Sequence, residues 1–178
     1  MKSYIWLLSG LMLAALPASA EVTQAEADGF QIDLARTSTL EPADLFERAG
    51  TLSDWWSPEH TWSGSSENLY LTKLAPGGLW QEVWADGSVE HGRLIAFVSS
   101  DETRLMRFET ALGPLQGMGV GAILTITVRE DTDFDTPAKS VVTFRYLVTG
   151  AEFQDLSALA PAVDGVLSEQ IDRLSEAK

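Results

Sequence analysis

The sequence predicts an α+β fold in which a strand and a short helix come first, a run of antiparallel strands follows, and a long helix closes the chain. Three observations predict this order. Apolar residues alternate with polar ones in short segments between residues 69 and 149, as in half-buried strands. Turn-forming Gly, Pro, Ser and Asp separate these segments at hairpin spacing. After Gly150 the apolar residues recur every three to five positions, which is typical of an amphipathic helix.

The first predicted elements are a strand over Phe30–Ala35, which alternates at period two, and a helix over Glu41–Gly50. Pro42 stands at the first helical position, acidic residues occupy the first turn, and Gly50 lies just past the end. The next residues, 54–64, contain Pro, Ser and Gly that interrupt any regular period. We therefore expect a tight turn and an irregular segment after the helix.

Six further strands are expected before the final helix. They are Leu69–Lys73, Leu79–Trp84, Val89–Val98, Arg104–Leu112, Ile123–Arg129 and Val141–Thr149. In the last of them Val142, Phe144 and Tyr146 share one face, while Thr143 and Arg145 share the other. One face of the sheet is therefore expected to be buried and the other wet.

The expected C-terminal helix is about four turns or longer, with Pro161 and Gly165 breaking its regularity early. Its apolar stripe is Leu156, Leu159, Val163, Leu167, Ile171 and Leu174. The chain has no internal repeat, linker or low-complexity tract, so residues 21–178 are expected to form a single domain.

Residues 1–20 have the features of a signal peptide. Lys2 supplies the positive start, Tyr4–Leu16 is an apolar stretch too short to span a bilayer, and Ala18-Ser19-Ala20 fits the cleavage rule. We expect cleavage after Ala20 and a periplasmic or secreted protein; an uncut N-terminal anchor is the alternative. Without another long apolar run, no membrane insertion is expected after cleavage.

The composition excludes several classes of protein. The chain has 12 Lys and Arg against 26 Asp and Glu, a net charge of -14. Removal of Lys2 with the signal peptide leaves 11 basic and 26 acidic residues, or -15. Such a charge repels phosphates, so nucleic acid is not an expected partner. The chain contains no Cys, which excludes disulfides, thiol catalysis and thiolate metal sites.

Five tryptophans gather within thirty residues: Trp55, Trp56, Trp62, Trp80 and Trp84. Tryptophan buries a large apolar area and carries an N–H that needs a partner, so such a cluster suits the wall or rim of a pocket. Two other interpretations stay open. The tryptophans could build the core, above all Trp80 and Trp84 on one strand face, or could form a surface patch for a partner or a carbohydrate.

The two histidines each follow a glutamate, as Glu59-His60 and Glu90-His91. Neighbours in a strand point to opposite faces, so Glu90 cannot orient His91, and a catalytic pair would need a partner from elsewhere in the fold. Nothing in the spacing predicts a metal site. His91 could hydrogen-bond a ligand inside a cavity or serve as a structural histidine.

Two loops were candidates for other sites. Asp131, Asp133 and Asp135 have the spacing that opens a calcium loop, but Thr136 stands where Gly is needed and Val142 where Glu is needed, so a solvated hairpin tip is expected. The glycine-rich residues 113–121 follow a strand and lead into another strand. We expect a mobile loop at a cavity mouth, from which Gln116 and Met118 reach inward.

The element order and four short segments carry a resemblance. The segments are Trp55–Pro58, Gly77–Glu82, Gly87–His91 and Leu112–Met118. Together with the closing helix they resemble the SRPBCC or START-like superfamily, nearest to bacterial proteins grouped with polyketide cyclases and with the activator of the heat-shock chaperone ATPase. The resemblance covers about residues 29–176. It implies a helix-grip fold: a curved antiparallel sheet of about seven strands wrapped on the C-terminal helix, with short helices after the first strand and an apolar cavity.

Members of that superfamily carry lipids, bind hormones, cyclise polyketides or assist chaperones, so the fold alone does not define an activity. We expect an exported protein that holds a small hydrophobic or aromatic molecule between sheet and helix. We expect no metal or cofactor, and we assign no catalytic residue. The expected ligand-binding residues are Trp55, Trp56, His60, Trp62, His91, Gln116 and Met118.

Two alternatives use the same fold. One is a cyclase-like or dehydratase-like enzyme in which His91 or Glu82 moves a proton in the cavity. The other is a protein-interaction domain without a ligand. Binding is favoured because nothing in the sequence demonstrably brings a second titratable group near His91 in the fold.

Overall fold

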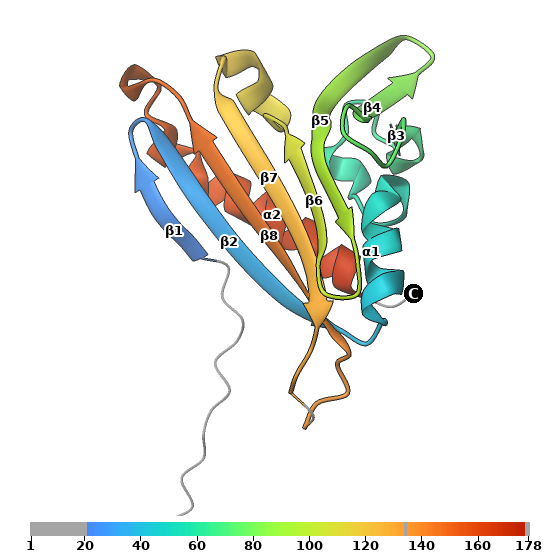
Figure 1. The fold of residues 1–178 in the computed structure, drawn as a ribbon. Helices are drawn as coiled ribbons and strands as arrows, with labels where there is room; N and C mark the ends of the chain where they lie inside the picture. Colours follow the sequence, from blue (N-terminus) through green and yellow to red (C-terminus); the bar gives the residue numbers. More distant parts are fainter. Residues whose placement is uncertain (1–20, 134, 177–178) are drawn as a thin grey trace, which may run out of the picture.

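Eight antiparallel strands form one curved sheet in the computed structural model, which describes residues 21–133 and 135–176 (Figure 1). The predicted signal peptide lies outside the described residues. The strand order is β1-β2-β8-β7-β6-β5-β4-β3, so β3 to β8 form a meander and β2 returns to pair with β8. The strands are β1 (Glu21–Glu26), β2 (Gly29–Ser38), β3 (Leu69–Leu71), β4 (Leu79–Trp84), β5 (Gly87–Ser99), β6 (Arg104–Glu109), β7 (Gly121–Glu130) and β8 (Ser140–Thr149).

Seven of these strands were predicted, and β1 was not. This strand pairs only with β2, at the edge of the sheet, and most of its described side chains are exposed. An edge strand of this kind needs no alternation of apolar and polar residues, and the segment around Val22 shows none. Backbone pairing with β2 therefore forms the strand without a signal in the sequence.

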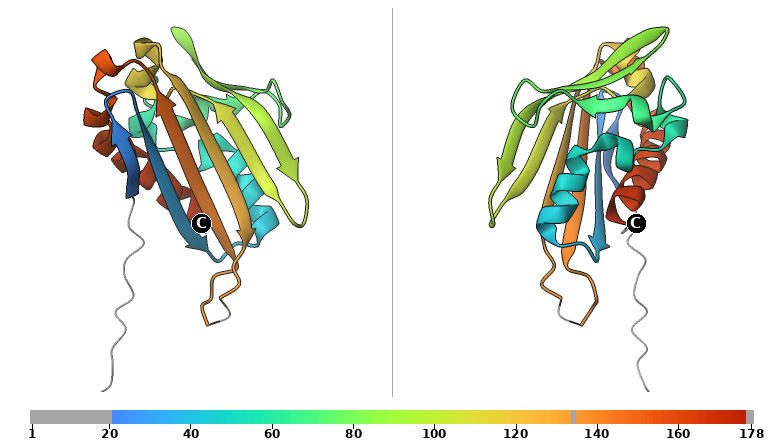
Figure 2. Two further views of the ribbon diagram at one scale, coloured as in Figure 1. Left: turned by 60° about the vertical axis from the view of Figure 1, so that its left-hand side comes forward. Right: turned by 90° about the vertical axis from the view of Figure 1, so that its right-hand side faces the viewer.

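Both helices lie against the same face of the sheet, as the two views of Figure 2 show. The first, α1 (Pro42–Gly50), follows β2 as predicted. The second, α2 (Ala160–Ser175), packs against β2, β1 and β8. It begins later than the predicted stripe, because Pro161 occupies the first turn and the residues before it form the short 3-10 turns η5 (Glu152–Gln154) and η6 (Leu156–Ala158).

The face of the sheet toward the helices is the core. Val142, Phe144 and Tyr146 are at most 1% exposed, whereas Arg145 between them is exposed. The predicted alternation in β8 is thus confirmed. A curved antiparallel sheet around a C-terminal helix, with short helices after the first predicted strand, is the predicted architecture, and β1 adds one strand to it.

Two buried polar side chains hold the segments that surround one end of this core. The Tyr146 hydroxyl donates to the carbonyl of Thr110 at 3.0 Å and accepts from the N–H of Leu112 at 3.1 Å. Burial raises the pKa of Tyr146 to about 12, so the phenol stays neutral. Gln170 of α2 accepts from the N–H of Ser57 at 2.8 Å. These bonds position the chain on both sides of the pocket described next.

Candidate functional site

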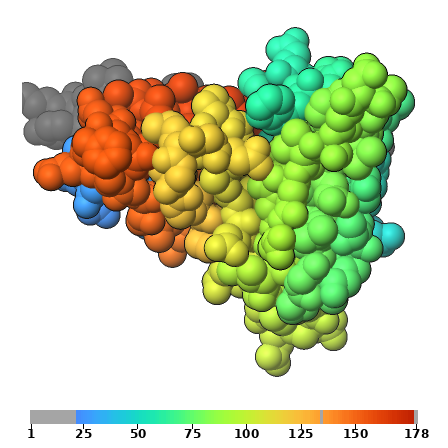
Figure 3. All heavy atoms as spheres, turned by 90° about the horizontal axis from the view of Figure 1, so that it is seen from above, coloured from blue at the N-terminus to red at the C-terminus, as the bar shows by residue number. Residues whose placement is uncertain are grey.

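An apolar pocket of about 580 Å³ lies between three short segments and the C-terminal helix. One wall is the chain around the 3-10 turn η2 (Pro58–His60) and another is the 3-10 segment η4 (Gly113–Met118). The start of α2 and part of β5 complete it. Figure 3 looks onto this end of the molecule, where η4 (yellow) lies between the chain leading into α2 (orange-red) and the β4–β5 hairpin (green).

The lining is mostly aliphatic and aromatic. Helix α2 contributes Val163 and Leu167, the residue just before it is Leu159, and η4 contributes Pro114 and Leu115. None of these five residues was among the expected ligand-binding residues. Leu159, Val163 and Leu167 belong to the predicted apolar stripe. An apolar helix position that faces a cavity has the same sequence pattern as one that faces the core, so the stripe could not reveal the pocket.

The tryptophan cluster divides between the core and the pocket. Trp55 is fully buried and packs on Trp56 and Phe144, with ring centroids 5.4 and 5.9 Å apart, so it belongs to the core. Trp56 lines the pocket, and its Nε1 donates to the carbonyl of His60 at 3.0 Å. Trp62 lines the rim and is 60% exposed.

Four of the seven predicted ligand-binding residues line the pocket: Trp56, His60, Trp62 and His91. The other three do not. Trp55 lies in the core, and the exposed Gln116 donates to the carbonyl of Glu90 outside the pocket at 2.5 Å. Met118 packs, partly buried, against the core. The turn of η4 explains why Gln116 does not line the pocket, because it directs Leu115 inward and leaves Gln116 exposed.

A β-bulge places His91 beside Glu82. In the pairing of β4 with β5, Trp80 lies opposite Gly92 and Gln81 opposite Glu90, so His91 is the extra residue. A bulge bends the strand and redirects a side chain, and here His91 and Gly92 are both buried. Glycine is required at position 92, since a Cβ there would lie 2.5 Å from a side-chain atom of Thr110, which follows β6.

Glu82 is a buried carboxylate with three hydrogen-bond donors around it. It accepts from the backbone N–H of Ser63 at 2.5 Å, from the N–H of Trp62 at 3.1 Å and from Nε2 of His91 at 2.9 Å. Burial disfavours the charged form, but these hydrogen bonds outweigh it and hold the pKa of Glu82 below its ordinary value of 4.5. The charged side chain therefore fixes both the His91 ring and the loop that carries Trp62.

The second histidine of the pocket is also held by a carboxylate, but near the surface. Nε2 of His60 lies 3.0 Å from Oε2 of Glu169 on α2, and the two side chains are 31% and 40% exposed. Hydrogen bonds from Ser57 and His60 hold the pKa of Glu169 below its ordinary value, against a smaller opposing effect of burial. This pair links η2 to α2 across the pocket rim.

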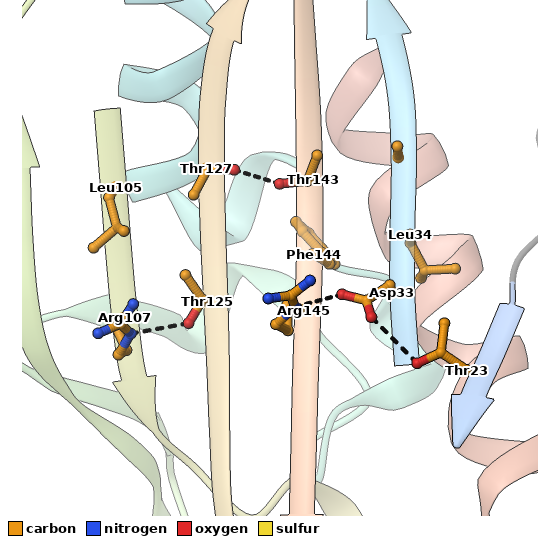
Figure 4. Close-up of a pocket in the computed structure, with 11 residues that line it drawn as sticks. Thr23, Asp33, Leu34, Leu105, Arg107, Thr125, Thr127, Thr143, Phe144 and Arg145 are labelled. Atoms are coloured by element: carbon orange, nitrogen blue, oxygen red, sulfur yellow. Dashed lines mark hydrogen bonds and ion pairs between the residues drawn. The ribbon is translucent and has the colours of Figure 1, made fainter. Parts of the chain in front are cut away.

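A different hollow, of about 760 Å³, lies on the opposite face of the sheet (Figure 4). A row of polar side chains crosses five strands there. Arg107 donates to Thr125, Arg145 to Asp33, and Thr23 to Asp33, at distances of 2.6 to 3.2 Å. Since these groups satisfy one another on an open polar surface, this hollow is a poorer fit for an apolar ligand.

No group of three or more His, Cys, Asp or Glu that could hold a metal ion occurs in the described residues. In the loop that was weighed as a calcium site, Asp131 accepts from the N–H of Asp133, and Asp133 accepts from the N–H of Asp135, both at 3.1 Å. These carboxylates stabilise the turn of the hairpin tip. Neither helix in residues 21–133 and 135–176 has the length and apolar character needed to cross a membrane.

The fold and the pocket define a helix-grip protein, in which a curved sheet holds the C-terminal helix beside a cavity. Solved structures have the same fold. Thalictrum flavum norcoclaurine synthase superposes with a TM-score of 0.54 at 15% identity, over 83% of this chain and 92% of that one. A Thermobifida fusca protein superposes with a TM-score of 0.57 at 14% identity, over 82% of this chain and 91% of that one. A hypothetical Helicobacter pylori protein superposes with a TM-score of 0.55 at 10% identity, over 95% of this chain and 98% of that one.

At these identities the likeness concerns the fold alone. No family model matches the sequence, and no curated protein matches it.

Proposed function

We propose that this protein binds a small hydrophobic or aromatic molecule in the pocket between η2, η4 and α2. The observation that carries the proposal is the pocket itself, because about 580 Å³ of apolar space with a few polar groups is typical of small-molecule sites. His60 and His91 supply those polar groups, each held in place by a carboxylate. The norcoclaurine synthase structure is a complex with a transition-state analogue, so a protein of this fold accommodates such a compound.

Saturable binding of an uncharged apolar probe tests this proposal. N-phenyl-1-naphthylamine is suitable, since the acidic protein would repel an anionic dye. Its entry should shield Trp62 from water and shift the tryptophan fluorescence to shorter wavelength. At a free concentration one hundred times the Kd, the probe should stabilise the fold by about 2.7 kcal/mol, which raises the Tm by about 5–10 °C.

Two variants show whether the probe occupies this pocket. Trp62→Ala removes an exposed rim residue and should weaken binding by about tenfold or more without unfolding the protein. Phe153→Ala is the matched control, because Phe153 is 90% exposed and does not line the pocket. A wild-type protein with no saturable response, or equal losses in the two variants, would contradict the proposal.

We also propose that the protein is exported and cleaved after Ala20. The small residues Ala18-Ser19-Ala20 fit the cleavage rule, which supports this site. The intact mass of the protein recovered from the exported fraction should correspond to a chain that begins at Glu21. A mass that includes Met1 in that fraction would refute the cleavage.

A further inference from the structure

His91 lines the apolar pocket, and one of its two ring nitrogens has no partner in the described residues. The same residue also lines a smaller hollow of about 230 Å³, together with Glu90 and Gly92. Nε2 is bonded to Glu82, and Nδ1 has no hydrogen-bond partner in the described part of the chain. Nδ1 is also not among the fully buried polar atoms that lack a partner, so it keeps accessible surface.

Glu82 determines which nitrogen carries the proton. A carboxylate with no proton accepts hydrogen bonds only, so the bond of 2.9 Å requires a hydrogen on Nε2 of His91. In the neutral ring Nδ1 then carries a lone pair, which can accept a proton from a bound molecule. His60 is bound to Glu169 in the same way. The His60 and Glu169 side chains are 31% and 40% exposed, however, so water competes for the hydrogen bonds of the His60 ring.

We propose that the pocket carries a proton-transfer activity, in which Nδ1 of His91 is the general base for an apolar ligand with an acidic C–H next to a carbonyl group. The proton passes from carbon to Nδ1, and the C–H electron pair forms the double bond of an enolate. The imidazolium then returns the proton to another atom of the same molecule, so the isomerisation consumes no co-reactant. This activity rests on the proposed ligand binding. His91 is the catalytic residue and Glu82 a positioning residue.

The first test is the tautomer of His91. The protein contains only two histidines, so nitrogen NMR of histidine-labelled protein gives two rings, and His60→Gln assigns them. We expect neutral His91 as the Nε2–H form, with a bare Nδ1. In the folded fraction of Glu82→Gln, His91 should occur as a mixture of both neutral tautomers. A purely structural role for Glu82 does not require this change. A proton on Nδ1 in the wild-type protein would overturn the proposal.

The second test is a model reaction that needs only a base in an apolar site. In nitrobenzisoxazole, Nδ1 removes the proton from carbon, the C–H pair completes a nitrile, and the N–O bond breaks to leave a coloured nitrophenolate. The proton on His91 then passes to water. We expect His91→Gln to lower kcat/KM by about 100-fold or more, because general base catalysis contributes that much. Glu90→Gln, which changes the exposed neighbouring carboxylate, should leave it unchanged.

Binding is measured separately with nitroindazole, which has a similar shape but no N–O bond to break. If it binds the wild type and His91→Gln alike and only turnover is lost, the proposal is supported. If nitroindazole binds but kcat/KM of His91→Gln falls less than threefold, the proton-transfer activity is refuted while ligand binding stands. The same holds if kcat/KM falls in His60→Gln instead of His91→Gln. If nitroindazole does not bind the wild type, the proton-transfer activity is refuted, and if N-phenyl-1-naphthylamine does not bind either, ligand binding is refuted too.

Discussion

Replacing Glu82 with leucine is expected to lower the free energy of unfolding by about 3–5 kcal/mol. Glu82 is fully buried, and its loss removes the acceptor of three donors: the part-buried N–H groups of Trp62 and Ser63 and the buried Nε2 of His91. Each such orphan costs about 1–3 kcal/mol, and removing one partner of a buried pair is costlier than replacing both. Urea denaturation of the wild type and Glu82→Leu measures the difference.

The pH dependence gives an independent check on the same group. The pKa of folded Glu82 lies below the ordinary value of 4.5, so the unfolded chain binds a proton more readily. Its contribution is therefore fully present above pH 4.5 and lost as the pH falls through the folded-state pKa. The stability difference between the wild type and Glu82→Leu should narrow in that range.

Glu90→Leu is the control for this substitution. Glu90 forms an exposed ion pair with Arg93, so its replacement should cost about 1 kcal/mol or less. Similar costs for Glu82→Leu and Glu90→Leu would mean that Glu82 does not hold the three donors.

Phe144→Ala is expected to cost about 3–5 kcal/mol, the range for a large buried aromatic residue replaced by alanine. Phe144 is 1% exposed and packs against Trp55, with ring centroids 5.9 Å apart. Thr143 is its neighbour on the other face and pairs with the hydroxyl of Thr127. Thr143→Ala should therefore cost about 1 kcal/mol or less. Thermal or urea unfolding that shows equal effects would mean that the register of β8 is wrong.

The class of fold and most strands could be predicted from the sequence, because alternation at period two is a local property. Strand β4 has the predicted bounds Leu79–Trp84, and β8 begins one residue before the predicted Val141 and ends at the predicted Thr149. Pro42 and Gly50 likewise located α1. Trp80 and Glu82 lie on one face of β4 and are both buried, but the burial of Glu82 was not predicted.

Which chemical groups meet depends on how distant segments pack together. No titratable partner of His91 could be predicted from the sequence, yet the bulge in β5 brings Nε2 of His91 to 2.9 Å from Oε2 of Glu82. Similarly, nothing local distinguishes Trp55 from Trp56, although one packs in the core and the other lines the pocket. The reason is physical: an alternating pattern defines the face of a side chain, whereas its partner depends on strand register and on how α2 and η4 pack over that face.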